Sequence, residues 1–117
     1  MSENKATVQK YMDGFIASDH SKILSCLTKD IYSEVPGFFS VTGKQAFDNE
    51  IENDAFVGSP QITILRLLEE NNIVIAEGSV QSTKKDGSRF DAVFCDVFEM
   101  EDGKIKRITS YLIEMTK

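Results

Sequence analysis

The sequence predicts an α+β fold in which N-terminal helices pack on a curved antiparallel sheet. Apolar residues recur at helical spacing in the first part of the chain, but from Gln61 onward they alternate with a period of two. Helices followed by consecutive strands are typical of domains in which the helices cover one face of the sheet. Because 117 residues with 41% hydrophobic side chains suffice for one core and not for two, we expect residues 1–117 to form a single domain.

Two helices are expected at the N-terminus. The first carries one apolar stripe at helical spacing, and Ser2 is a candidate for its N-cap. The stripe consists of Val8, Tyr11, Met12, Phe15 and Ile16. Asp19 can cap a second, shorter helix that is predicted to end within residues 28–30. The apolar residues of this second helix are Ile23, Leu24 and Leu27.

A short strand and a third helix are expected before the main sheet. Residues 31–35 alternate as a strand, which stops at a Pro-Gly pair. The adjacent Phe38 and Phe39 are then predicted to stand in a loop, as a lid or a rim. A glycine opens a helical stretch that is expected to run over residues 44–53.

The rest of the chain predicts four long strands joined as an antiparallel meander. Their turns carry Asn-Asn, Lys-Asp-Gly and Glu-Asp-Gly sequences, which are typical of hairpin connections. The strands are expected over residues 62–69, 73–83, 89–100 and 104–115.

One carboxylate lies in an apolar row of the third of these strands. Alternation puts Asp96 on the same face as Phe94, Phe98 and Met100. A carboxyl group among aromatic rings either finds a partner or stays protonated with a raised pKa, and it can then donate a hydrogen bond inside an apolar pocket. Asp96 is therefore the main candidate for a functional residue. The alternatives are a wetter face than the pattern indicates, or a structural bond to a neighbouring hydroxyl.

Composition excludes several classes of partner. A formal net charge of −6 leaves no basic stripe for nucleic acid. No apolar run is long enough for a membrane span and no signal peptide is recognisable, so we expect a cytoplasmic protein that does not bind membranes. Cys26 and Cys95 are expected to be reduced and buried. His20 is the single histidine and is interpreted as a surface residue, so we expect no metal and no organic cofactor.

Three segments resemble parts of one known superfamily. Residues 8–19 resemble the first helix of ketosteroid isomerases, residues 42–46 are similar to their Gly-led third helix, and residues 96–105 are similar to their penultimate strand and its turn. With the order of elements, the chain resembles the NTF2-like superfamily, which includes nuclear transport factor 2, ketosteroid isomerases, scytalone dehydratase and SnoaL-like polyketide cyclases. The resemblance implies a cone, also called a cystatin-like roll, around an apolar pocket.

The resemblance also implies roles for particular residues. In ketosteroid isomerases a tyrosine of the first helix and a protonated aspartic acid of the penultimate strand form the oxyanion hole, and Tyr11 and Asp96 match them. Val35 stands where that family has its catalytic aspartate, so the usual base is missing. A tyrosine in a helical stripe is also typical of a plain core residue.

Other residues could complete such a pocket. Glu34, Glu77 and Glu114 are candidates to replace the base, although alternation points Glu34 to the opposite face unless a bulge rotates it inward. Aromatic side chains would line or fill the pocket and so bind the substrate. They are Phe15, Phe38, Phe39, Phe47, Phe94 and Phe98.

The resemblance supports two hypotheses of function. In the first, a cofactor-independent isomerase or cyclase admits a small hydrophobic ligand, and Tyr11 and Asp96 stabilise negative charge on its oxygen. In the second, the chemistry is lost and the cone is a ligand-binding or homodimerisation module. Candidates for the apolar outer face of the sheet are Leu65, Leu67, Val93, Val97 and Ile113. Epoxide hydrolysis is disfavoured, because Arg66, Arg89, Asp91 and Asp96 do not suggest the Asp-Arg-Asp constellation it needs.

Overall fold

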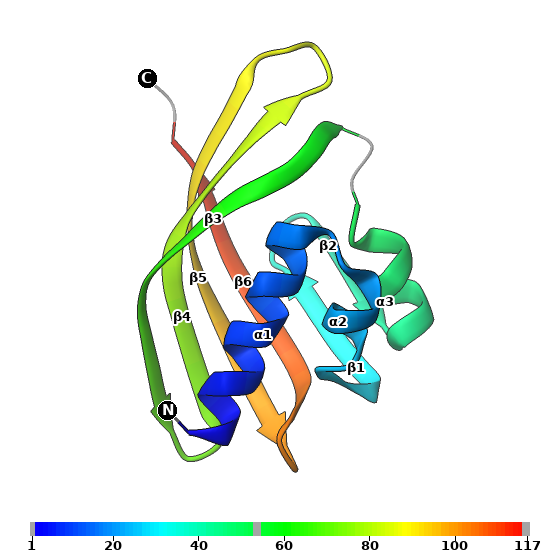
Figure 1. Cartoon of the computed structure of the whole chain (residues 1–117), viewed down its shortest axis with the longest axis vertical. Coiled ribbons are helices and arrows are strands. Elements are labelled where there is room, and N and C mark those ends of the chain that lie inside the picture. The colour runs from blue at the N-terminus through cyan, green and yellow to red at the C-terminus, as the bar shows by residue number, and fades with distance from the viewer. Residues whose placement is uncertain (1, 53–54, 116–117) are drawn as a thin grey trace.

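A curved sheet wraps around the first helix (Figure 1). The computed structural model describes residues 2–52 and 55–115. Within these residues the sheet has the strand order β2-β1-β6-β5-β4-β3. The strands are β1 (Leu27–Val35), β2 (Phe39–Thr42), β3 (Phe56–Glu70), β4 (Ile73–Lys84), β5 (Arg89–Glu101) and β6 (Lys104–Glu114). The helices are α1 (Glu3–Ala17), α2 (His20–Leu24) and α3 (Lys44–Glu50).

The predicted α+β class and the four-stranded meander β3–β6 are confirmed. The sheet differs from the prediction in one pairing, because β1 lies parallel to β6. Periodicity shows which residues share a face of a strand, but it does not show which strands are neighbours. Strands β2 to β5 lie between β1 and β6 in the chain, yet β6 returns beside β1 and runs in the same direction.

The starts of the first two helices agree with the sequence, whereas the end of the second does not. Ser2 Oγ accepts a hydrogen bond from the Lys5 N–H (3.1 Å), and the Asp19 side chain accepts one from the Lys22 N–H (3.1 Å). The prediction that the second helix includes Leu27 is wrong, since β1 begins at this residue. Leu27 is buried in the sheet, and a single apolar residue fits either period.

The segment after β1 is more regular than expected. The chain turns back through residues 36–38, and Phe39 opposite Val35 opens the short strand β2, so the predicted loop contains only Phe38. Helix α3 ends at Glu50, and its expected end at Asn53 lies outside the described residues. Strand β3 begins at Phe56, ahead of its predicted start, and its pairing with β4 is interrupted between Val57 and Gln61.

The core lies between α1 and the concave face of the sheet. Val8 and Met12 of α1 are buried there with Phe98 and Met100 of β5, as the apolar row of that strand predicts. Each such side chain contributes about 1.5 to 3 kcal/mol by leaving water. Leu67 also packs against this core, so its assignment to the outer face is wrong. No helix among the described residues is long and apolar enough to cross a membrane.

Gly78 permits a close approach of two strands on the concave side. A Cβ atom at this position would lie 2.1 Å from the Thr63 carbonyl oxygen of β3 and 2.9 Å from Cζ of Phe94. The first of these atoms belongs to the backbone, so a side chain at residue 78 would force β3 to move.

We therefore expect Gly78→Ala to lower the free energy of unfolding by about 1 to 3 kcal/mol, as overpacked sites do. Urea unfolding followed by circular dichroism measures this. Gln81→Ala, at an exposed position of the same strand, is the control and should change little. Equal stability of Gly78→Ala and the native protein would contradict the close approach.

Candidate functional site

Two adjoining cavities lie between the C-terminal half of α1 and the sheet. Each has a volume of about 160 Å³. Four residues line both of them: Tyr11, Phe15, Asp96 and Ser110. Together the cavities approach the lower end of the roughly 300 to 1,000 Å³ that is typical of ligand sites. Tyr11 and Asp96, which the sequence singles out, therefore face the same space.

The two cavities extend in opposite directions from these four residues. One reaches toward β1, β2 and α3, and its further lining is Ser33, Val35, Phe39, Val41, Phe47, Glu50 and Ile108. The other reaches toward β3 and β4, and its further lining is Met12, Ile62, Val80, Phe94 and Leu112. The first is the more polar of the two, because it contains a second carboxylate and a second serine.

Asp96 is enclosed by apolar side chains but keeps contact with the cavity. Burial raises the pKa of its carboxyl from the usual 3.8 to about 7, although a hydrogen bond from Ser110 Oγ to Oδ1 (2.5 Å) acts in the opposite direction. Both expectations for this residue therefore apply, a raised pKa and a bond to a neighbouring hydroxyl. Near neutral pH a large fraction of the carboxyl groups is protonated and can donate a hydrogen bond.

Tyr11 is also positioned as a donor. Burial, reinforced by the nearby Asp96 charge, raises the pKa of its phenol well above the usual 10.0, so the hydroxyl keeps its proton. Its ring is fixed edge-on by Phe15 (5.0 Å between centroids) and Phe98 (5.5 Å). No hydrogen bond joins Tyr11 to Asp96, and no described residue accepts one from the Tyr11 hydroxyl.

Four of the six aromatic candidates line the cavities, one lies in the core and one is exposed. Phe15 lines both cavities, while Phe39, Phe47 and Phe94 each line one. Phe98 is fully buried and lines neither, so it fills the core beneath Tyr11. Phe38 is 74% exposed in the turn after β1 and lies away from both cavities.

None of the three carboxylates suggested to replace the base reaches this space. Glu34 points to the opposite face of β1, toward Arg107 (3.8 Å), while its neighbour Val35 lines the cavity. Strand alternation therefore holds at this point, and no bulge turns Glu34 inward. The other two, Glu77 and Glu114, form ion pairs with Arg66 (2.6 Å) and Lys84 (3.4 Å).

Sequence reasoning missed three polar residues of the site, Ser33, Ser110 and Glu50. Ser110 is opposite Asp96 only because the pairing of β5 and β6 shifts between Glu99 and Met100. The spacing of the buried Ile105 and Ile108 was the available signal, since a separation of three residues cannot keep both on one face of a regular strand. Glu50 had a weaker signal, as it shares a helical face with Phe47.

Neither the Asp-Arg-Asp constellation of epoxide hydrolysis nor a cluster of metal ligands forms among the described residues of this site. Arg66 is paired with Glu77, and Arg89 is paired with Asp91 (3.0 Å), so neither arginine lines a cavity with Asp96. Among the described residues no group of three or more His, Cys, Asp or Glu side chains is arranged to hold a metal ion. Both cysteines are free thiols, Cys26 buried and Cys95 half-buried.

A larger groove, of about 490 Å³, lies outside these cavities. It shares Phe15 with them and is otherwise lined by residues such as Ser18, Ser59 and Lys85. It contains neither Tyr11 nor Asp96. We place the candidate site in the smaller cavities because the groups with strongly shifted pKa values are there.

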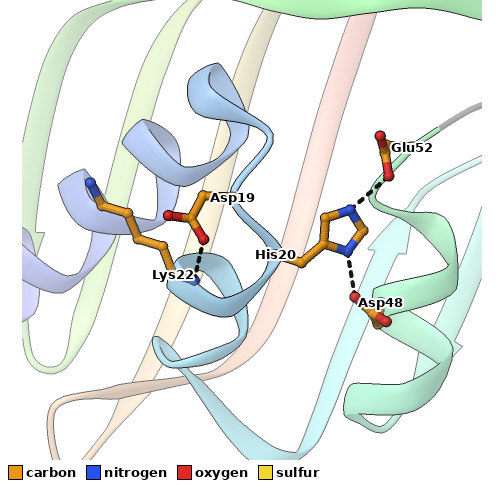
Figure 2. A network of polar contacts seen from close by, with 5 residues as sticks. All are labelled: Asp19, His20, Lys22, Asp48 and Glu52. Carbon is orange, nitrogen blue, oxygen red and sulfur yellow. Dashed lines mark hydrogen bonds and ion pairs between the residues drawn. The ribbon is translucent and has the colours of Figure 1, made fainter.

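His20 holds α2 against the segment that carries α3. Figure 2 shows its ring between Asp48 and Glu52. The distances are 2.6 Å from Nδ1 to Asp48 Oδ1 and 2.7 Å from Nε2 to Glu52 Oε1. Both contacts are hydrogen bonds only when the imidazole is doubly protonated. The bonds to Asp48 and Glu52 raise the pKa of His20, so their stabilising effect is present at low pH and is lost as the pH rises through that pKa.

Comparison with known proteins shows the family to which this chain belongs. Residues 8–108 match the SnoaL-like domain, and the chain belongs to this family within the NTF2-like fold. No curated protein matches the sequence. The predicted superfamily is thus confirmed.

Solved structures share the fold at low sequence identity. An LEH-like epoxide hydrolase from M. tuberculosis has a TM-score of 0.83 and 20% identity, covering 95% of this chain and 83% of that one. A candidate ketosteroid isomerase from Kribbella flavida DSM 17836 has a TM-score of 0.77 and 24% identity, covering 98% and 81%. A candidate polyketide cyclase from Xanthomonas campestris pv. campestris has a TM-score of 0.84 and 22% identity, covering 93% and 89%.

The pKa of Asp96 predicts how stability depends on pH. Between the usual 3.8 and about 7, the carboxyl is protonated in the folded protein and ionised in the unfolded one. Stability should therefore fall as the pH rises through this window, by about 1.4 kcal/mol for each unit of pKa shift. Urea unfolding at a series of pH values measures this. The Asp96→Asn variant should lack the part of this pH-dependent loss of stability that is due to Asp96.

His20 adds a pH dependence of the same sign, so the difference between native protein and Asp96→Asn is the relevant quantity. Asp91→Asn, which alters a partly exposed carboxylate paired with Arg89, is the matched control and should keep the native pH dependence. Parallel pH profiles for the native protein and Asp96→Asn would show that Asp96 is ionised in the fold.

Proposed function

We propose that this protein binds a small hydrophobic ligand that carries a carbonyl or phenol, and that Tyr11 and Asp96 donate hydrogen bonds to the ligand oxygen. The activity would be that of a cofactor-independent isomerase or cyclase of the ketosteroid-isomerase type. The observation that carries the proposal is the shared lining of two largely apolar cavities by Tyr11 and Asp96, both of which have a pKa raised by burial.

Electrostatics favours an oxygen that gains negative charge. Neither Tyr11 nor Asp96 donates to a described residue, so each proton is available to a ligand. Donors in a site that excludes water stabilise a developing oxyanion by roughly 3 to 4 kcal/mol each. The membership of the SnoaL-like family, whose fold neighbours include candidate isomerases and cyclases, is consistent with this chemistry.

Fluorescence titration with 2-naphthol, whose emission reports its protonation state, tests the donors. We expect the native protein to bind the naphtholate, and Tyr11→Phe to weaken binding by about 10- to 100-fold. That range corresponds to one hydrogen bond to a charged group, about 1.5 to 3 kcal/mol. Asp96→Asn should also weaken it, because an amide is a weaker donor than a carboxylic acid.

Tyr111→Phe is a matched control, because this tyrosine is 52% exposed and lies outside both cavities. Its affinity should equal that of the native protein. Unchanged affinity in both Tyr11→Phe and Asp96→Asn, with only stability altered, would overturn the proposal.

The second candidate function is association through the outer face of the sheet. Val93 lies opposite Ile113 on this face, and Ile75 lies between Leu68 and Val97. Ile113 and Leu68 are 63% and 53% exposed. Apolar rows of this kind, running across several strands, favour a second copy of the chain as partner.

If the outer face joins two copies, Ile113→Glu should convert a dimer into a monomer, because the new carboxylate would be buried without a partner. Sedimentation velocity at high protein concentration measures the change, with at least about a tenfold rise in the dissociation constant expected. Gln45→Glu, exposed on α3, is the control. A native protein that stays monomeric at every concentration would remove this candidate.

A further inference from the structure

The usual family base is absent at Val35, yet the cavity contains a second carboxylate. Glu50, the last residue of α3, lines the same cavity as Tyr11, Asp96 and Val35. Its side chain makes no ion pair or hydrogen bond with a described residue. By contrast Glu34, Glu77 and Glu114 are all paired with basic side chains elsewhere.

The geometry of α3 directs Glu50 toward the cavity. Phe47 and Glu50 are three residues apart, so they share a face of the helix, and both line the cavity. Asp48 of α3 and Glu52, which follows the helix, bind His20 instead (Figure 2). His20 therefore holds this segment against α2, while Glu50 stays unpaired at the rim of the cavity, where it is also exposed to solvent.

We propose that Glu50 is the general base of this protein. It takes the role of the aspartate that ketosteroid isomerases have at the position of Val35. This rests on the proposed function, since it assumes a ligand oxygen bound by Tyr11 and Asp96. Glu50 and Asp96 line the same cavity of about 160 Å³, so one small ligand there has both carboxyl groups at its walls. The substrate class is a small apolar ketone with an acidic C–H next to its carbonyl.

The reaction step balances without a co-reactant. The Glu50 carboxylate takes the proton from the carbon next to the carbonyl. The C–H electron pair becomes the carbon–carbon double bond of an enolate, and the carbonyl π electrons move to the oxygen, where Tyr11 and Asp96 donate their hydrogen bonds. Glu50 then returns a proton to the carbon. In D₂O the acid form of Glu50 exchanges with solvent, so deuterium replaces hydrogen in the ketone.

Exchange of 2-tetralone protons in D₂O, followed by ¹H NMR, tests this step. The fully aromatic counterpart of its enol is 2-naphthol. The two compounds therefore form a matched pair, in which 2-naphthol reports binding and 2-tetralone reports proton transfer. We expect the native protein to accelerate the exchange above the buffer rate. Glu50→Gln should reduce the protein-catalysed rate by about 100-fold or more, since a positioned base contributes 10²- to 10⁴-fold. Its affinity for 2-naphthol should stay close to that of the native protein.

Glu34→Gln is the matched control, because this carboxylate is next to Val35 but on the outer face. It should exchange 2-tetralone protons at the native rate. Native exchange by Glu50→Gln would overturn the assignment, and loss of exchange only in Asp96→Asn would make Asp96 the base. A native protein that binds 2-naphthol without accelerating exchange would also overturn it. Failure to bind 2-naphthol at all would instead remove the proposed function itself.

Discussion

The structure depends on the packing of α1 into the concave face of a strongly curved sheet. One stripe of the helix covers the inward residues of β5 and its neighbours, and residues of both belong to a single buried core. The curvature needs positions where strands approach closely or shift register, such as Gly78 and the irregularity between Glu99 and Met100. The core closes around the first half of α1, whereas its second half, from Tyr11 to Phe15, borders the two cavities.

The cavities share a polar centre, Asp96 and Ser110, on paired strands. Their contact satisfies one carboxyl oxygen, but it does not compensate for the loss of water around the charge, since the pKa is still raised to about 7. Burial, to which the apolar row of β5 contributes, is thus the cause of the raised pKa. A change in its packing would alter the chemistry of Asp96 without touching the residue itself.

Periodicity was sufficient for those features that depend on one strand or one helix at a time. It placed the stripe of α1, the four strands of the meander and the inward face of Asp96. It failed where the outcome depends on a partner element. Leu27 fits a helix or a strand, and β2 is a strand only because it pairs with β1. Ser110 reaches Asp96 only through the irregular register of β6.

The candidate site shows the same division between local and tertiary information. Asp96 could be found because it breaks a local apolar pattern, and Tyr11 because its place in the first helix resembles that of the ketosteroid-isomerase tyrosine. Glu50 could not, because a carboxylate at the end of an amphipathic helix is ordinary in sequence, and only the position of α3 beside β1 and β2 brings it to the cavity. The contact of His20 with Asp48 and Glu52 joins residues that are 28 and 32 positions apart, and no spacing rule relates them.

The energetics of Asp96 argue that this residue serves the cavity more than the fold. A buried carboxyl with a raised pKa makes the folded state less stable at neutral pH, by about 1.4 kcal/mol for each unit of the shift. An apolar or amide side chain of similar size would avoid this cost while keeping the apolar row intact. Residues that lower stability in this way are typical of functional sites, where chemistry requires an environment that the fold alone would not select. The same reasoning does not apply to Ser110, whose hydroxyl lowers the cost by donating to the carboxyl. Asp96 is the group that would meet the ligand we propose, and the hydrogen bond from Ser110 lowers the cost of its burial.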